Sequence, residues 1–242
     1  MAKQAKATKA TNASGGDNFT RWLVIGMVTL VVATGAIFSV VSQKSKANES
    51  FVALKDFKVG APVAATVDVA NGSGITLNPE ITKTIDLWED PQCPICNTFE
   101  GANGAYIDEL IRTKKAKVVY HVVSFIGNES ISAANAAYCA ADEGHYLDFH
   151  KALYLVQPSL ENSGFFTSTN LLKIGTYAGL KSKSFVDCVN KASKLDQVKA
   201  AYDSMAKYKV QGTPTVFFNG KLWERKNSGF VLDEFSAAFE AS

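Results

Sequence analysis

The chain has 242 residues, 47% hydrophobic and 20% charged, a composition typical of a globular protein with room for one sizeable domain. Its net charge of +2 arises at the start, where residues 1–21 contain one acid, Asp17, and four basic residues, Lys3, Lys6, Lys9 and Arg21. The remainder is close to neutral, and the lack of a broad basic field excludes nucleic acid as an expected partner.

The first 42 residues predict a membrane anchor. Residues 1–21 are expected to be a disordered cytoplasmic tail. Residues 22–42 carry no charge, and a helix of that length spans about 30 Å, the thickness of a bilayer core. A buried core helix is rarely so long without a charge. A cleaved signal peptide is the stronger alternative, because Ser45-Lys46-Ala47 suits cleavage, although such peptides have apolar stretches of about 7–15 residues.

Residues 43–74 are predicted to be an extracytoplasmic tether that contains a short strand at 62–69. Lys44 and Lys46 follow the span and weaken the charge bias that would orient it. The cysteines are the better guide, since persistent disulfides belong to an oxidising compartment. We therefore expect the N-terminus in the cytoplasm and residues 43–242 outside the cell membrane.

A β-α-β unit is predicted next, with Cys93-Pro94-Ile95-Cys96 at the strand-to-helix junction. Residues 81–88 alternate as a strand, and residues 117–123 form a second strand. Between them, Gly101 and Gly104 weaken a helix whose apolar residues recur at helical spacing: Ile95, Phe99, Ala102, Tyr106 and Leu110.

The C-terminal half completes an α/β fold class. Residues from about 130 to 208 are helical in pattern throughout, and a strand at 215–218 ends in the turn Asn219-Gly220. A final amphipathic helix covers about 231–239. A helical insertion thus interrupts a β-α-β…β-β-α scaffold.

Two cysteines at this spacing can cycle between dithiol and disulfide, supply half of a metal site, or form a static bridge. A cysteine at a helix N-terminus meets unpaired N–H groups and the positive end of the dipole, which favour its thiolate. Cys93 is therefore the expected nucleophile, and Cys96 the thiol that resolves a mixed disulfide. Because Pro94 and Ile95 are uncharged, stabilisation of the thiolate is expected mostly from the backbone.

The other uses of the pair are less consistent with the sequence. A zinc site needs two more suitably spaced ligands, whereas Cys139 and Cys188 stand alone, so no metal is predicted. Haem attachment needs a histidine where Asn97 stands, and a static bridge in so small a ring adds little stability. The three histidines are interpreted as packing or surface residues: His121, His145 and His150.

Two segments together resemble the DsbA-like branch of the thioredoxin superfamily, and more closely its membrane-anchored actinobacterial members. They are Trp88–Cys96 (WEDPQCPIC) and Gly212–Gly220 (GTPTVFFNG), about 120 residues apart with helices between. The likeness covers about residues 75–242 and includes shorter stretches at 99–104, 120–121 and 138–142. It implies a thioredoxin-like domain over residues 75–242.

The resemblance implies roles for individual residues. Cys93 matches the family's exposed nucleophile and Cys96 its buried resolving cysteine. Pro214 matches a proline that the family holds in a cis peptide bond beside the dithiol, which would free the backbone of Thr213 to pair with an extended substrate.

Two further pairs have implied roles. Some members place an acid under the dithiol as a proton shuttle. Asp86, Glu89 and Asp90 are available here, and Glu89 and Asp90 are the candidates; the alternative for each is a solvated charge at a strand end. Actinobacterial members carry a structural disulfide at positions that match Cys139 and Cys188. It would close a loop of roughly 50 residues and contribute about 4 kcal/mol by chain entropy, whereas two buried free thiols are the alternative.

The implied function is a membrane-anchored thiol-disulfide oxidoreductase that introduces disulfides into unfolded or folding exported proteins. No dissociable cofactor is expected, because the Cys93–Cys96 disulfide is the redox centre. A membrane partner of the VKOR or DsbB type would reoxidise it. Two alternatives stay open: a disulfide reductase or isomerase, because uncharged Pro94 and Ile95 do not set the direction, and a non-catalytic thioredoxin-like chaperone that binds peptides.

Overall fold

The structure is a computed structural model that describes residue 25, residues 51–72 and residues 74–242. The predicted tail (1–21) and anchor (22–42) therefore lie outside the described residues, Ile25 excepted. Within the described ranges, no helix is both long and apolar enough to cross a membrane. One compact unit spans Ala47–Ser242 and contains all four cysteines.

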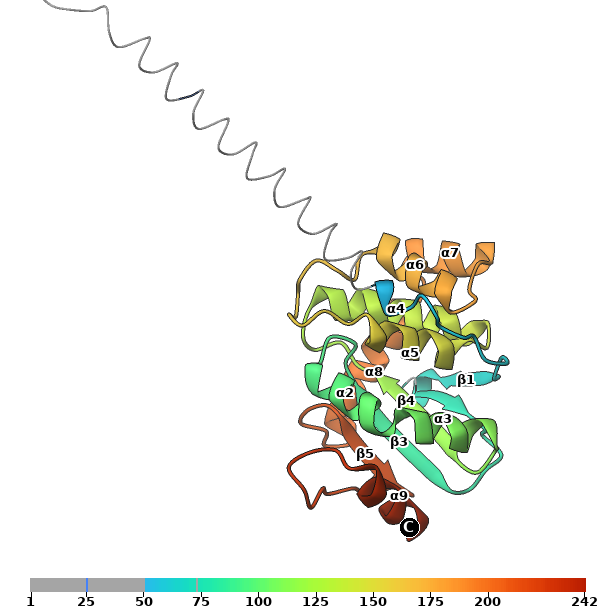
Figure 1. Ribbon diagram of the computed structural model, residues 1–242, viewed down its shortest axis with the longest axis vertical. Coiled ribbons are helices and arrows are strands. Elements are labelled where there is room, and N and C mark those ends of the chain that lie inside the picture. The colour runs from blue at the N-terminus through green and yellow to red at the C-terminus, as the bar shows by residue number, and fades with distance from the viewer. Residues whose placement is uncertain (1–24, 26–50, 73) are drawn as a thin grey trace, which may run out of the picture. The chain divides into compact units, whose positions relative to one another are not determined.

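A six-stranded mixed sheet lies at the centre of this unit, in the order β1-β2-β4-β3-β5-β6 (Figure 1). The strands are β1 (Ala65–Asp68), β2 (Gly74–Leu77), β3 (Thr84–Glu89), β4 (Lys117–Val122), β5 (Thr215–Phe218) and β6 (Lys221–Leu222). β3 pairs in parallel with β4, where Leu87 is opposite Tyr120, and antiparallel with β5, where Trp88 is opposite Thr215. The strands predicted around CxxC and at 215–218 are confirmed. β2 was not predicted, because four residues beginning with glycine give too short a pattern.

Helices surround the sheet, joined to it by short turns. They are the 3-10 turn η1 (Val69–Asn71), α2 (Pro94–Phe99), the π-helical turn η2 (Glu100–Gly104), α3 (Ala105–Arg112), α4 (Asn128–Asp142), α5 (Tyr146–Leu155), α6 (Ser168–Tyr177), α7 (Lys183–Asn190), α8 (Leu195–Lys207) and α9 (Leu232–Glu240). The insertion predicted over 130–208 is confirmed as α4 to α8, and the final helix as α9.

The helix after CxxC differs from its prediction in phase. The wide turn η2 shifts the buried face, so that Phe99, Asn103 and Ile107 are fully buried, four residues apart. Ile95, predicted on the apolar stripe, is 54% exposed. A π turn adds a residue to one turn of helix, which a regular 3.6-residue period cannot anticipate.

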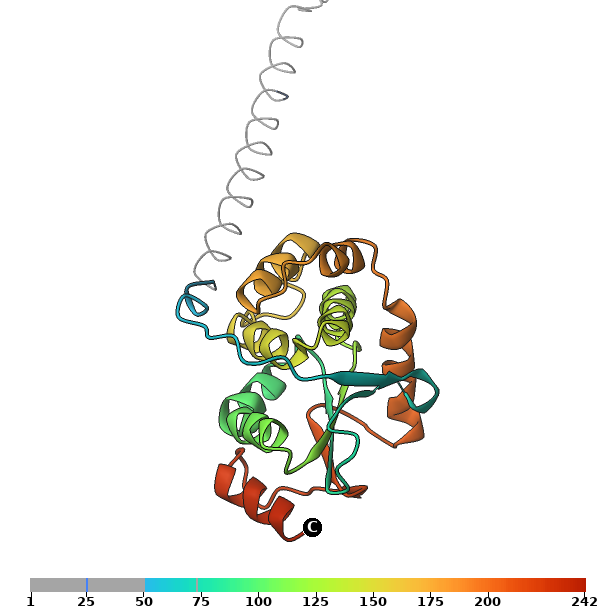
Figure 2. The ribbon, with the colours of Figure 1, turned by 90° about the vertical axis from the view of Figure 1, so that its right-hand side faces the viewer.

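The sheet separates two helical layers. Figure 2 shows the green helices α2 and α3 and the dark red α9 on one side of the strands, with the orange α8 on the other. On the first side the rings of Phe99 and Phe235 meet edge to face, 5.6 Å apart. On the second, the indole N–H of Trp88 donates to the hydroxyl of Ser204, at 3.2 Å. The first contact joins α2 to α9, and the second joins β3 to α8.

The packed domain begins before residue 75. β1 belongs to the central sheet, although its segment was expected to be part of a tether. Phe51 and Leu54 are buried, and the Phe51 ring lies 6.2 Å from that of Tyr177 on α6. Apolar residues scattered through a polar segment have no period, so only the fold reveals that they pack.

A disulfide joins two helices of the insertion. Cys139 on α4 and Cys188 on α7 are bonded, with an S–S distance of 1.99 Å and a sequence separation of 49. Ten of the fifteen residues of α4 are buried, which explains its many alanines: they let neighbouring helices approach closely.

Candidate active site

The dithiol lies where β3 ends and α2 begins. Cys93 is the N-cap of α2, and its sulfur accepts a hydrogen bond from the N–H of Cys96 at 3.4 Å. Pro94 fits the first helical position because its missing N–H would be unpaired there. Both thiols are unbonded.

Cys93 is less accessible than expected. It exposes 6% of its surface and Cys96 exposes none, so the implied exposed nucleophile is corrected to a largely covered one. Tyr154 from α5 and the partly buried Ile126 pack against the pair, and the thiol of Cys93 is 3.6 Å from the carbonyl oxygen of Thr213, to which it donates.

The two sulfurs have opposite electrostatic environments. Hydrogen bonding with Cys96, then with Thr213 and the N–H groups of Cys96 and Ile95, lowers the pKa of Cys93 from 9.0 to about 6. The Cys96 side chain is the largest cause, so the expectation of a mostly backbone effect was incomplete. Burial, then Cys93 and the charge of Glu89, raises the pKa of Cys96 well above its usual range. One thiolate and one thiol are therefore favoured at neutral pH.

The thiolate absorbance of the reduced protein at 240 nm should rise with pH through a midpoint near 6. The pKa of Cys93 is lowered from 9.0 to about 6. The thiolate's stabilisation of the folded dithiol is therefore complete above pH 9 and lost as the pH falls through about 6. In Cys96→Ala, which lacks the largest cause, the midpoint should move upward. A wild-type midpoint above 8 would contradict the geometry.

Thr213 and Pro214 lie beside the dithiol, although about 120 residues of chain separate the segments in sequence. The Thr213–Pro214 peptide bond is cis, as the resemblance implied. β5, which follows, pairs with β3, which precedes the dithiol, and this pairing brings the segments together.

Asp90 has a structural environment. Its Oδ1 accepts from the N–H of Gln92 and from the hydroxyl of Ser130, and its Oδ2 accepts from the N–H groups of Phe125 and Ile126. Both oxygens are thus occupied in holding together the loops around the dithiol. Of the two acids expected as candidate shuttles, Asp90 is the less suitable.

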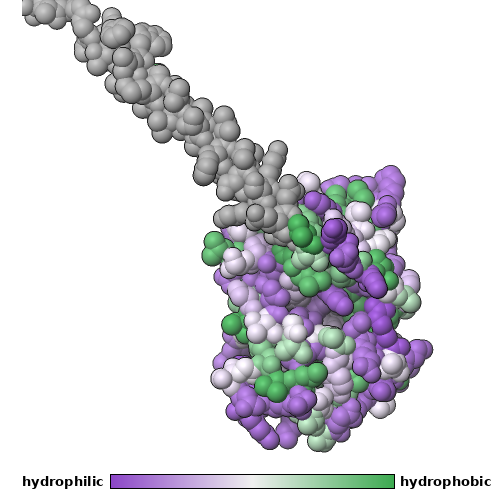
Figure 3. Space-filling model, in the orientation of Figure 1, coloured by the Kyte–Doolittle hydropathy of each residue, from purple (hydrophilic) through white to green (hydrophobic). Residues whose placement is uncertain are grey.

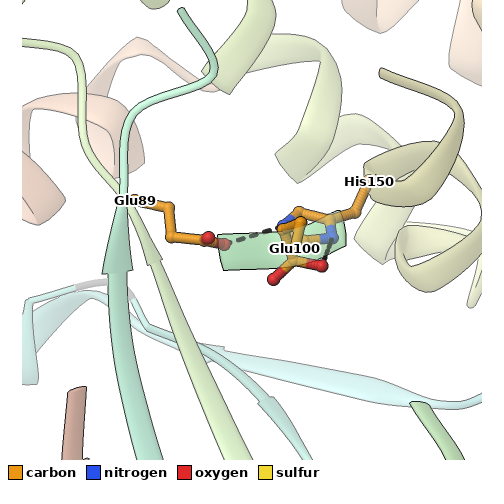
Figure 4. Close-up of side chains that lie close together, drawn as sticks. All are labelled: Glu89, Glu100 and His150. Carbon is orange, nitrogen blue, oxygen red and sulfur yellow. Dashed lines mark hydrogen bonds and ion pairs between the residues drawn. The ribbon is translucent and has the colours of Figure 1, made fainter. Parts of the chain in front are cut away.

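Glu89 belongs to a buried cluster with Glu100 and His150, shown in Figure 4. Its Oε2 is 2.9 Å from Nε2 of His150, whose Nδ1 is 3.8 Å from Oε2 of Glu100. Burial raises the pKa of Glu89 well above its usual range, and burial followed by the charge of Glu89 raises that of Glu100 to about 8. Burial lowers the pKa of His150, so a neutral ring lies against two acids that favour protonation and that hydrogen-bond with each other.

His150 was interpreted as a packing or surface residue; its buried ring does pack against Tyr154, and it also pairs with Glu89, which the sequence did not indicate. It lies 61 residues from Glu89 in sequence, and no spacing signal connects the two positions. The other two interpretations hold. His121 stacks on Trp88 with ring centroids 3.9 Å apart, and His145 pairs with Asp148 at 3.3 Å near the surface.

The cluster has the donor types of a metal site but a different orientation. One ligand atom from each of Glu89, Glu100 and His150 lies within 4.8 Å of the others. A single ion would need both carboxylates on the same side of one ring nitrogen. Here the two carboxyls take opposite nitrogens of the ring and also hydrogen-bond with each other, which suits a closed group of hydrogen bonds.

Comparisons with known proteins agree with this geometry. Residues 71–239 match the family model Thioredoxin_4, described as Thioredoxin. The chain is 27% identical to oxidised DsbA of Mycobacterium tuberculosis (TM-score 0.58; 66% of this chain, 82% of that one). It is 22% identical to MdbA, a thiol-disulfide oxidoreductase from Corynebacterium matruchotii (TM-score 0.62; 74% and 95%).

A curated relative is of another kind. The serine/threonine-protein kinase PknE of Mycobacterium tuberculosis is 28% identical over 149 residues. The match covers 55% of this chain but only 26% of the kinase.

Proposed function

Since a family model spans residues 71–239, this chain belongs to the thioredoxin family, and we propose that it introduces disulfides into exported proteins. Its domain is a DsbA-like thiol-disulfide oxidoreductase domain with the α/β fold and helical insertion that the sequence predicted. The proposal concerns the direction of the reaction, its substrates and its compartment.

The lowered pKa of Cys93 carries the proposal. A thiolate that is stable at neutral pH stabilises the dithiol relative to the disulfide, and so makes the disulfide a stronger oxidant. With hydrogen bonding to Cys96 as the largest cause, the pKa falls from 9.0 to about 6. At pH 7 this shift favours the dithiol by about tenfold, which is about 30 mV in reduction potential.

The reaction would proceed through Cys93. A substrate thiolate attacks the Cys93 sulfur of the Cys93–Cys96 disulfide, the S–S bond breaks, and Cys96 leaves and is protonated. A second substrate thiolate then attacks the substrate sulfur of the mixed disulfide and releases Cys93 as a thiolate. The substrate loses two electrons, which the enzyme retains as its dithiol until a membrane partner of the VKOR or DsbB type reoxidises it.

Thr213 and Pro214 are proposed to align the substrate, and Glu89 to protonate Cys96. The carbonyl of Thr213 is 3.6 Å from the Cys93 sulfur, so a chain paired with this backbone would present its thiol there. Exposed Ile95 and Phe125 could contact apolar residues of an unfolded chain. On the face drawn in Figure 3, hydrophobic patches are small and separated by hydrophilic residues.

The compartment is proposed to be extracytoplasmic, with anchoring through residues 22–42. Two observations support this placement: the Cys139–Cys188 disulfide, which an oxidising compartment preserves, and the twenty-one uncharged residues near the N-terminus. The same disulfide is proposed to be purely structural, because it joins α4 to α7 and not the elements that carry the dithiol.

Residues 43–242 should oxidise reduced, unfolded RNase and reduce insulin only slowly. Equilibration with glutathione should give a potential well above that of thioredoxin, about −270 mV. A potential at or below that value, with rapid insulin reduction, would support a reductase. The matched control is Cys139→Ala/Cys188→Ala, which should keep the wild-type potential because the active-site pair is unchanged.

A further inference from the structure

Cys96 is sealed from solvent, so its proton must come through the protein. It has no exposed surface, yet it becomes a thiolate each time the disulfide opens. Glu89, whose charge contributes to the raised pKa of Cys96 after burial and Cys93, is the neighbouring acid. However, Glu89 is itself 3% exposed and borders a space of only about 10 Å³, close to the minimum for one water molecule. Once it has given up a proton, Glu89 needs a supply of its own.

His150 and Glu100 connect Glu89 to a larger space. A cavity of about 240 Å³ is lined by His150 and Glu100 but, among the described residues, not by Glu89. Its rim includes the exposed residues Gly101 and Leu155, so it opens at the surface. Glu89 meets both of these residues: its Oε2 is 2.9 Å from Nε2 of His150, and its carboxyl also hydrogen-bonds with that of Glu100, whose Oε2 is 3.8 Å from Nδ1 of His150. From inside to outside, Glu89 is thus followed by His150 and Glu100 together, and these two line the cavity.

The π turn makes room for this arrangement. Glu100 is its first residue and Gly104 its last. A Cβ atom at residue 104 would collide with the carboxyl of Glu100. One oxygen of Glu100 and one of Glu89 are buried and receive no hydrogen bond from an N–H or hydroxyl of the described residues, and the two carboxyls hydrogen-bond with each other, so one of them carries a proton. π turns are often found at functional sites.

We propose that His150 and Glu100 are a proton relay that joins Glu89 to the cavity and so protonates and deprotonates Cys96 during turnover. The relay rests on the proposed function only in needing the dithiol to cycle. As the disulfide opens, Glu89 gives its proton to the Cys96 sulfur. His150 then gives the proton on Nε2 to Glu89 and accepts one at Nδ1 from Glu100, which regains a proton from water. Enzyme reoxidation reverses each transfer. His150 and Glu100 do not touch the reacting sulfurs and act only through Glu89, so they are positioning residues and not catalytic ones.

Among the titratable groups around His150, the relay residues are the main path by which protons reach Glu89. Tyr120 from β4 and Tyr146 and Tyr154 from α5 face the His150 ring, and burial raises the pKa of each tyrosine well above its usual range. Asp108 and Lys151 also line the cavity. Asp108 is paired with Arg112 at 3.0 Å. The charge of Asp108 is a smaller cause that raises the pKa of Glu100 and opposes the lowering of that of His150.

The test follows reduction of the oxidised protein by dithiothreitol, by stopped-flow tryptophan fluorescence, with rates expressed per dithiothreitol thiolate. His150→Ala should slow the reaction about 100-fold, the lower end of what general acid–base catalysis contributes. Added imidazole should restore it, because the cavity admits a small base. The equilibrium constant with glutathione should change less than about threefold, since a relay alters rates and not end states.

The wild-type rate should fall above pH 8 as Glu100, whose pKa burial raises from 4.5 to about 8, loses its proton. Glu100→Gln, which keeps the shape, should abolish that fall.

His145→Ala is the matched control, a nearby histidine that does not line the cavity, and it should keep the wild-type pH profile. The relay would be overturned if His150→Ala and Glu100→Gln kept the wild-type dependence of rate on pH. It would also be overturned if imidazole did not restore the rate that His150→Ala loses. A rate that EDTA abolishes and zinc restores would also overturn it in favour of a metal centre. Because dithiothreitol is the probe, these outcomes are independent of whether RNase oxidation succeeds.

Discussion

Cys93→Ala is expected to abolish oxidation of reduced RNase completely. Without Cys93 the active-site disulfide cannot form, so no oxidising equivalents are available, whatever the other contacts contribute. Its sulfur is also the one whose pKa hydrogen bonding to Cys96, above all, lowers to about 6. The measurement is recovery of RNase activity with glutathione disulfide as the terminal oxidant, compared with the background rate of glutathione alone.

Two companion variants make this result specific. Cys96→Ala should also be inactive, but with glutathione disulfide it should accumulate a mixed disulfide at Cys93, visible as a mass increase, since the resolving thiol is missing. Cys139→Ala/Cys188→Ala should retain the wild-type rate under conditions where it is folded. Full function in Cys93→Ala would instead favour a thioredoxin-like chaperone that binds peptides without redox chemistry.

Removing the second cysteine pair should have the largest effect on stability. Cys139 and Cys188 are 49 residues apart, and closing a loop of that size restricts the unfolded chain by about 4 kcal/mol. Cys139→Ala/Cys188→Ala should therefore lower the free energy of unfolding by about this amount. With a urea m-value of about 2 kcal/mol/M, the midpoint of unfolding should fall by about 2 M.

The control for this prediction is Cys93→Ala/Cys96→Ala. It removes the same number of sulfurs, but its ring is too small to restrict the unfolded chain much, so the urea midpoint of the oxidised protein should change far less. A decrease below about 1 kcal/mol in the Cys139→Ala/Cys188→Ala variant would mean that the insertion is held by packing alone. The buried face of α4 would then be the main source of its stability.

Much of the fold was predictable from local patterns. The strand that ends at Glu89, the helix that begins at Pro94 and the helices of the insertion follow from periodicity and end signals, which depend on residues within one or two turns. The exceptions are β2, which is too short to show alternation, and η2, whose extra residue changes the phase of the buried face. The packing of Phe51 and Leu54 was likewise invisible in a segment without a period.

The sequence by itself determined the chemistry. It indicated two thiols at a helix N-terminus, and a second motif that contains Pro214 and belongs to the same domain. Only the tertiary structure decided how that chemistry is controlled. It covers Cys93, makes Cys96 the main stabiliser of its thiolate, and gives both oxygens of Asp90 to structural hydrogen bonds. It also brings Glu89 and His150 together across 61 residues. Proton affinities depend on desolvation and on a few polar contacts of about 3 Å, and both arise from residues that only long-range packing makes neighbours.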